Sequence, residues 1–306
     1  MSDRRRRAAA AGVGVVLDRL LGEPMVRPHP VAAFGWGMAR LERPLYLDDR
    51  LQGALYLGAG LGTGLMAGGV VGSTAAATYL AVAGRSLADE ARSIGLLLGA
   101  DDLHGARAAL PALVGRDPSG LGPEEMARAV VESVAENTVD AVVAPALWGA
   151  SAGAGGALGH RAVNTLDSMV GHHNDRYERF GWASARADDL AAWVPARFTA
   201  GLVALVRPAT AAAVLRTVRR DAPLHPSPCA GVAEAAFAAA LGLRLGGPSR
   251  YGDRVEDRPA LGDGPPPAVA DIEPACRLSE DVSLALAGLL VAPLALHALC
   301  RMVSRR

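Results

Sequence analysis

Long apolar stretches without charge dominate the pattern of the chain. Residues 51–84 form 34 consecutive uncharged positions, and residues 282–300 form a second run of 19. Because a helix needs only about 20 apolar residues to cross the hydrocarbon core of a bilayer, both runs predict transmembrane helices. Residues 141–159 and 190–215 are weaker candidates, each either a further crossing or a buried helix of a soluble or re-entrant region.

Helix signals also mark the polar stretches between these runs. Residues 86–113 predict an amphipathic helix or helix pair facing water. A helix is expected to start at Pro123 and to continue through Asp140, because Glu124 and Glu125 place negative charge in its first turn. Further expectations are a polar helix over 164–179, breaks in the 190–215 helix near Pro195 and Pro208, and loops over 221–270.

This pattern predicts the fold class and the topology. Little strand patterning and no internal repeat are found, so we expect an all-α, polytopic integral membrane protein whose polar helices and loops form a cytoplasm-facing site. A single membrane domain is expected over residues 1–306, with a Pro-rich loop and a C-terminal transmembrane helix in 263–306. Arginines cluster at both ends of the chain. The positive-inside rule therefore places both termini in the cytoplasm, with an even number of crossings.

Composition removes several classes of function. Hydrophobic residues make up 51% of the chain and 31 acidic residues balance 31 basic ones, so we expect no nucleic-acid partner. All of those basic residues are arginine, which excludes a lysine nucleophile, a lysine Schiff base and a Walker lysine. Cys229, Cys276 and Cys300 are too far apart in sequence to predict a disulfide framework or a structural zinc site.

Three carboxylates are spaced regularly along the helix expected from Pro123. Glu132, Glu136 and Asp140 recur at every fourth position, so we expect them on one helical face, with Asn137 beside them. Spacing alone also fits a solvated face, but the surrounding positions are mostly valine and alanine. Magnesium accepts such carboxylates, usually together with substrate phosphates, which makes this column a candidate metal site.

A second polar group lies in residues 164–176. Asn164, Asp167 and Ser168 are expected on one helical face. This group is either a ligand-binding face or an ordinary surface helix with a polar end, and its adjacent histidines are poor zinc ligands. The polar residues that follow the face are His172, His173, Asn174 and Arg176.

Isolated polar residues add candidates for binding anions. These are Arg116 beside Asp117, Arg197 after Pro195, and His225 in a His-Pro-Ser-Pro sequence. Each is a weak signal alone. No P-loop or His-Glu-x-x-His motif is present in the sequence, and no Gly-x-Ser-x-Gly motif is placed between an expected strand and a helix.

Several short sequences occur in an order that is more specific than any of them alone. They are Gly115-Arg-Asp-Pro-Ser, Val131-Glu-Ser-Val-Ala-Glu-Asn137, Asn164-Thr-Leu-Asp-Ser-Met-Val-Gly171, Pro195-Ala-Arg197 and His225-Pro-Ser-Pro228. Together they resemble the CobD/CbiB family of cobalamin biosynthesis membrane proteins, the adenosylcobinamide-phosphate synthases. The resemblance covers roughly residues 13–262.

The resemblance implies a multi-pass enzyme of the cell (inner or plasma) membrane that acts late in the corrinoid pathway. Members of the family join the propionate carboxylate of adenosylcobyric acid to the amine of (R)-1-amino-2-propanol or its O-phosphate, using ATP. Expected partners are the corrinoid, the aminoalcohol or its phosphate, the lipid bilayer and other late corrinoid-pathway membrane enzymes. ATP as co-substrate and Mg²⁺ are the expected cofactors.

The chain departs from the family pattern at three places. His172-His173-Asn174 stands where many relatives have Tyr-Lys-Asn, Ala192 stands where Asn is usual, and Cys229 stands where Asn commonly follows His-Pro-Ser-Pro. A cationic His173 would have to replace the lysine amine at a phosphate. The departures also leave two alternatives to an enzyme: a non-catalytic scaffold or sensor-like paralogue, and a corrinoid transporter.

The implied chemistry gives each candidate residue an expected role. A carboxylate is a poor electrophile, and ATP can convert it to an acyl phosphate, so magnesium, cationic donors and a base are needed. Glu136 is the first choice for the base and Asp167 the second. The expected metal ligands are Glu132, Glu136, Asp140 and Asp117; the expected substrate-binding residues are Arg116, Asn137, Asn164, Ser168, His173, Asn174, Arg176, Arg197 and His225.

Overall fold

The computed structural model describes residues 2–24, 28–115, 117–251 and 254–303, with side chains outside 248–257, 293 and 295–303. The chain folds into two compact units, each assembled from separated stretches of sequence. The first unit comprises Met1–Ala83, Asp140–Ala192 and Leu286–Arg306, and the second comprises Gly84–Val139 and Trp193–Ala285. A single domain over 1–306 stays a prediction.

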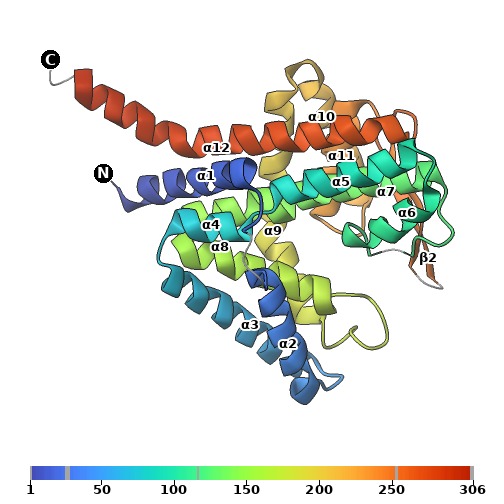
Figure 1. Cartoon of the computed structure of the whole chain (residues 1–306), viewed down its shortest axis with the longest axis horizontal. Coiled ribbons are helices and arrows are strands. Elements are labelled where there is room, and N and C mark those ends of the chain that lie inside the picture. Colours follow the sequence, from blue (N-terminus) through green and yellow to red (C-terminus); the bar gives the residue numbers. More distant parts are fainter. Residues whose placement is uncertain (1, 25–27, 116, 252–253, 304–306) are drawn as a thin grey trace. The chain divides into compact units, whose positions relative to one another are not determined.

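Helices make up almost all of the regular structure (Figure 1). The first unit contains α1 (Asp3–Leu21), α2 (Pro30–Leu45), α3 (Arg50–Val71), α4 (Thr74–Ala81) and α8 (Ala144–Val170), with the start of α9 (Trp182–Val206) and the end of α12 (Ile272–Val303). The second contains α5 (Gly84–Gly99), α6 (Leu103–Ala109), α7 (Pro123–Thr138), α10 (Ala211–Asp221), α11 (Ala230–Leu241) and a hairpin of β1 (Leu245–Tyr251) and β2 (Arg254–Leu261), with the remainders of α9 and α12.

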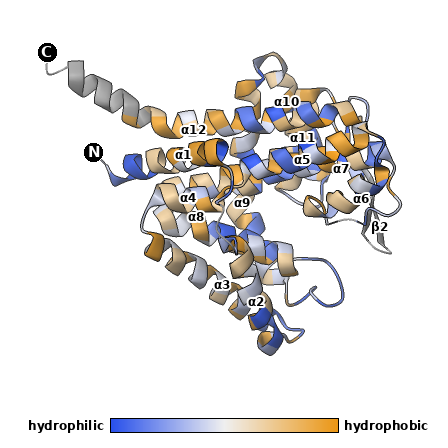
Figure 2. Ribbon diagram, in the orientation of Figure 1, coloured by the Kyte–Doolittle hydropathy of each residue, from blue (hydrophilic) through white to orange (hydrophobic). Residues whose placement is uncertain are grey.

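The membrane character expected from the sequence is confirmed. Arg50–Val71, Pro123–Val170 and Trp182–Val206 are, within the described chain, the helical segments long and apolar enough to cross a membrane. The ribbon of α3 is mostly pale to orange on the hydropathy scale of Figure 2. Residues 282–300 are helical within α12, but much of that run lies outside the described side chains. The number of crossings stays a prediction.

The uncharged run 51–84 forms two helices rather than one. α3 ends at Val71 because Gly72 adopts a left-handed conformation with φ of 66°. The Ser73 side chain then caps α4 by accepting a hydrogen bond from the Ala76 N–H at 3.3 Å. Within this run, α3 is therefore long enough to span a membrane, whereas α4 is a short helix.

α3 and α8 approach each other through their backbones. The buried face of α3 repeats glycine at every fourth position, at Gly60, Gly64 and Gly68. A Cβ added at Gly64 would lie 2.7 Å from the Leu158 carbonyl oxygen, and one added at Gly68 would lie 2.5 Å from the Gly155 Cα. Small residues permit such close contact between membrane helices.

The break expected at Pro195 is wrong, because α9 continues through that residue to Val206. Proline has no N–H and so leaves the carbonyl of the residue four positions earlier without its helical partner. That residue is Ala191, and its oxygen accepts a hydrogen bond from the indole Nε1 of Trp148 at 3.0 Å. The helix does end before Pro208, as expected.

The polar helix expected over 164–179 is wrong in its second half. α8 ends at Val170, and residues 171–181 form turns. The Asn174 side chain accepts hydrogen bonds from the N–H groups of Arg176 (3.1 Å) and Tyr177 (2.9 Å). Such local side-chain bonds compete with helical hydrogen bonds and stop the helix.

The loops expected over 221–270 also need correction. This region contains α11 and an antiparallel hairpin in which Leu245 pairs with Leu261 and Gly247 with Arg258. Both leucines are fully buried, so the base of the hairpin belongs to the core. Gly246 and Gly247 have φ of 88° and 95°, which an alternating strand pattern does not anticipate.

Candidate functional site

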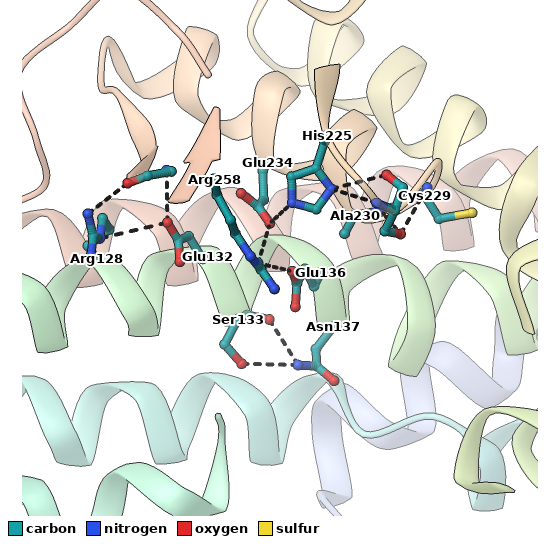
Figure 3. Close-up of polar contacts among 12 residues, drawn as sticks. Arg128, Glu132, Ser133, Glu136, Asn137, His225, Cys229, Ala230, Glu234 and Arg258 are labelled. Carbon is teal, nitrogen blue, oxygen red and sulfur yellow. Dashed lines mark hydrogen bonds and ion pairs between the residues drawn. The ribbon is translucent and has the colours of Figure 1, made fainter. Parts of the chain in front are cut away.

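Polar and charged side chains gather in the second unit where α7, α11 and the hairpin meet (Figure 3). We call Glu132 and Glu136 of α7 and Glu234 of α11 the carboxylate cluster. Glu132 and Glu136 lie one helical turn apart, as their spacing predicts. Glu234 is separated from Glu136 by almost a hundred positions in sequence, and no spacing rule connects the two.

Glu132 is the structural member of the cluster. Its side chain is 1% exposed, its Oε1 accepts the Gly246 N–H at 2.9 Å, and it lies 3.9 Å from Nε of Arg128. Arg128 in turn donates from Nη1 to the Gly246 oxygen at 2.7 Å. Both backbone groups of Gly246 are therefore held by α7, and we call this arrangement the Gly246 clamp.

Arg258 of β2 links the other two carboxylates. Its Nη1 lies 3.8 Å from Oε1 of Glu136 and 3.8 Å from Oε1 of Glu234. The Glu136 side chain is 33% exposed, whereas that of Glu234 is fully buried. Glu136 is therefore the carboxylate of the cluster that a substrate can reach.

Glu234 and His225 form a buried pair behind Arg258. The His225 Nε2 lies 3.6 Å from Oε1 of Glu234. The Nδ1 of His225 lies 3.1 Å from both the N–H and the carbonyl oxygen of Ser227, so the ring is held against its own loop. Burial lowers the pKa of His225 and favours its neutral ring. Burial, followed by the charges of Glu136 and Glu132, raises the pKa of Glu234 and favours its protonated form.

Arg197 holds the loop that carries His225. Its Nη1 donates to the Trp193 oxygen at 2.9 Å and to the Pro228 oxygen at 3.3 Å, and its guanidinium stacks 4.0 Å from the Trp193 ring centroid. The Ser227 Oγ accepts the Ala230 N–H at 3.1 Å, at the start of α11. Arg197 therefore positions the His225 loop, while binding of an anion by Arg197 stays a prediction.

Asn137 faces a different neighbour from the carboxylates. Its Nδ2 donates to the Ser133 oxygen at 3.0 Å and to the Ser133 Oγ at 3.1 Å, and the Ser133 Oγ donates to the Leu113 oxygen at 2.8 Å. The Asn137 amide is thus oriented by its own helix. Its role in binding substrate stays a prediction.

The acidic column does not continue in helical register to Asp140. α7 ends at Thr138, and Asp140 lies in the π-helical turn Val139–Val143, whose hydrogen bonds are one residue wider. Asp140 interacts electrostatically with Arg161. Asp117 accepts the Ser119 N–H at 2.9 Å in a loop turn, and Arg116 lies outside the described residues.

The donors fit a magnesium ion only if substrate completes its coordination. Among the described residues, no group of three or more His, Cys, Asp or Glu side chains is arranged to hold a metal ion. Magnesium usually takes one or two protein carboxylates and fills its other positions with water and substrate phosphates. The partly exposed Glu136 suits this role better than Glu132, which is engaged in the Gly246 clamp.

The second polar group belongs to the first unit. Asn164 donates from Nδ2 to Oδ1 of Asp188 at 3.3 Å, and Asp188 interacts electrostatically with Asp167. Asp188 is 9% exposed. Ser168 donates to the Asn164 oxygen of its own helix at 3.0 Å. The expected face of Asn164 and Asp167 is thus extended by an aspartate from α9.

The residues after α8 are engaged with protein groups. Arg176 donates to Oε1 of Glu42 at 2.9 Å and stacks 4.2 Å from the Tyr46 ring centroid. The Nδ1 of His173 lies 3.0 Å from Oε2 of Glu178, and both side chains are exposed. Arg176 therefore stabilises the first unit, whereas His173 remains accessible to a ligand.

Sequence reasoning missed four site residues: Arg128, Asp188, Glu234 and Arg258. Arg128 carries a local signal, because it precedes Glu132 by four positions on the same helix. The other three come from α9, α11 and β2, and only tertiary structure brings them to the residues that the sequence singled out.

Comparisons with known proteins point in one direction. A family model described as "CobD/Cbib protein" matches residues 11–279. Curated relatives named "Cobalamin biosynthesis protein CobD" include that of Mycobacterium tuberculosis, 49% identical over 93% of this chain and 95% of the relative. Those of Rhodobacter capsulatus (43% identical, 87% of this chain, 90% of the relative) and Geobacter metallireducens (42%, 81% and 84%) are also similar. No solved structure shows a significant match.

Proposed function

Because the chain belongs to the CobD/CbiB family of cobalamin biosynthesis proteins, we propose that it is an ATP-dependent carbon–nitrogen ligase. The proposed reaction joins adenosylcobyric acid to (R)-1-amino-2-propanol or its O-phosphate and gives adenosylcobinamide or its phosphate. The observation that carries the proposal is the carboxylate cluster, in which one accessible carboxylate, Glu136, lies beside the buried Glu234 and the cationic Arg258.

The proposed chemistry proceeds in two steps. The substrate carboxylate attacks the γ-phosphorus of ATP, which gives an acyl phosphate and ADP. The amine then attacks the acyl carbon, phosphate leaves with its bonding electrons, and the amine loses protons as the amide forms. Glu136 is proposed as the base that accepts a proton from the attacking nitrogen, with Asp167 as the second candidate.

The surrounding residues support this assignment for Glu136. Arg258 is close enough to both Glu136 and Glu234 to stabilise negative charge at either one. The protonated form of Glu234 would reduce the repulsion on Glu136 when it is ionised. Mg²⁺, held by Glu136 with Glu132 nearby, would supply charge neutralisation at the phosphates.

We also propose a location for the enzyme. It is a multi-pass protein of the cell membrane with both termini in the cytoplasm, where ATP and the corrinoid are available. The arginine clusters at both ends of the chain support this orientation. Other late corrinoid-pathway membrane enzymes are proposed neighbours.

The test is turnover by the purified full-length protein in detergent, with adenosylcobyric acid, the aminoalcohol phosphate, ATP and Mg²⁺. Amide product and ADP should form in equal amounts, and Glu136→Gln should abolish both. Glu124→Gln, an exposed carboxylate on the same helix, is the matched control and should retain activity. No ADP-linked product from the wild-type protein would instead favour a scaffold or a transporter.

A further inference from the structure

A basic cavity lies on α10, outside the carboxylate cluster. It has a volume of about 460 Å³ and is lined by Ala213, Arg216, Thr217, Arg219, Arg220 and Asp263. Three arginines and one aspartate thus face a single cavity. The sequence motifs and the proposed reaction give none of these residues a role.

The charges of the cavity are not balanced. Arg220 donates to both oxygens of Asp221 and to Oδ1 of Asp263 at 2.9 Å, so the aspartate of the lining is already paired. The side chains of Arg216 and Arg219 are exposed and make no hydrogen bond or ion pair with the described residues. Two guanidinium groups therefore remain available for an anion, and arginine binds phosphate oxygens in a bidentate manner.

The position of α10 in the chain favours an anion at a membrane surface. α9, which is long and apolar enough to span, ends at Val206, and α10 begins at Ala211. α10 buries Val214 and Thr217 on one face. Its opposite face exposes the arginines together with Leu215, which is 44% exposed. A helix with arginines and a leucine on its exposed face suits the boundary between headgroups and acyl chains.

We propose that this cavity binds the phosphate group of an anionic phospholipid, with Arg216 and Arg219 as its main contacts. Arg220, held by Asp221 and Asp263, forms the wall of the cavity. The exposed leucine would contact the lipid's acyl region while the guanidinium groups contact its phosphate. The site would fix the end of α9 to the membrane surface.

The test counts lipids that remain bound to the full-length protein in native mass spectrometry after release from mixed micelles. The probes are phosphatidylglycerol and phosphatidylcholine in equal amounts. The variant Arg216→Gln/Arg219→Gln is compared with Arg40→Gln/Arg43→Gln, which removes two exposed arginines three positions apart on α2. Removing two arginines near an anionic surface should reduce the preference for phosphatidylglycerol about 30-fold.

Arg40→Gln/Arg43→Gln should keep the wild-type preference for phosphatidylglycerol. If Arg216→Gln/Arg219→Gln also keeps it, the proposal is wrong. Displacement of phosphatidylglycerol by inorganic phosphate or ATP would assign the cavity to a soluble phosphate and overturn the lipid proposal. Asp263→Asn offers an independent arm, because it releases Arg220 from one carboxylate. It should increase the preference for phosphatidylglycerol, and an unchanged or lower preference would contradict the proposal.

Discussion

Substitutions of Glu132 and Glu136 should have different effects, the first on the stability of the protein and the second on its activity. Spacing alone gives them the same role, but the structure places Glu132 in the Gly246 clamp and leaves Glu136 one-third exposed. We therefore expect Glu132→Gln to destabilise the protein and Glu136→Gln to leave its stability nearly unchanged. Turnover should be lost in Glu136→Gln, where no change in folding can explain the loss.

The loss of stability expected for Glu132→Gln follows from the contacts of the Glu132 side chain. Glutamine can still accept the Gly246 N–H, but exchanging a charge-assisted bond for a neutral one costs about 1 kcal/mol. Removing one partner of a buried ion pair costs about 3–5 kcal/mol, and the 3.9 Å separation from Arg128 places this case at or below the lower limit. A total near 3 kcal/mol corresponds to a fall of about 6–12 °C in Tm for a unit of about 150 residues.

The assay is a thermal scan of each purified variant in one detergent, at one scan rate. Glu136→Gln should lie close to wild type, because a partly exposed pair at 3.8 Å contributes less than about 1 kcal/mol. Glu124→Gln, on the same helix but exposed, controls for loss of a carboxylate. A Tm within 2 °C of wild type for Glu132→Gln, a limit set by about 1 kcal/mol, would refute the clamp as a stabilising contact.

Three further predictions concern other parts of the molecule. The hydrogen bonds from Arg220 hold the pKa of Asp221 below its usual value, so the ionised Asp221 stabilises the fold at neutral pH and this stabilisation is lost as the pH falls below about 4. Asp221→Asn should therefore lower Tm at pH 7 and weaken the dependence of Tm on acid pH in thermal scans. His173→Ala should raise the KM for ATP or the aminoalcohol phosphate, and His173→Arg should preserve activity; unchanged KM values for both substrates in His173→Ala would contradict a phosphate-binding role for His173. Reporter fusions at either terminus should report the cytoplasmic side, and an external signal from one end would contradict an even number of crossings.

Local signals in the sequence were sufficient for much of the fold. The helix start at Pro123 and the helix pair within 86–113 appear as α7, α5 and α6, because proline, acidic first-turn residues and amphipathic spacing act within a few residues. The all-α membrane class follows from uninterrupted apolar length in the same way. The errors arose where a distant partner or a side-chain turn changed the local preference, as Trp148 does for the carbonyl freed by Pro195.

The candidate site was predicted only in part for the same reason. Glu132 and Glu136 share a helix, so their proximity can be derived from periodicity. Glu234 and Arg258 reach them through tertiary contacts across about a hundred residues of sequence, which spacing cannot reveal. The π-helical turn at Asp140 is equally invisible to a rule that assumes a constant helical period.

The glycine contact between α3 and α8 also bears on how the chain is made. Gly68 leaves the ribosome well before its partner Gly155, and at about 5–20 residues per second the delay over the intervening chain is about 4–17 s. During that interval the face of α3 that carries Gly64 and Gly68 lacks its α8 partner and contacts lipid or the insertion machinery instead. Crosslinks from Leu65→Cys, a position on α3 beside Gly155 and Gly159 of α8, to that machinery should therefore persist in chains arrested before residue 155 and disappear in longer ones. Crosslinking that is independent of chain length would show that α3 does not wait beside the insertion machinery for α8.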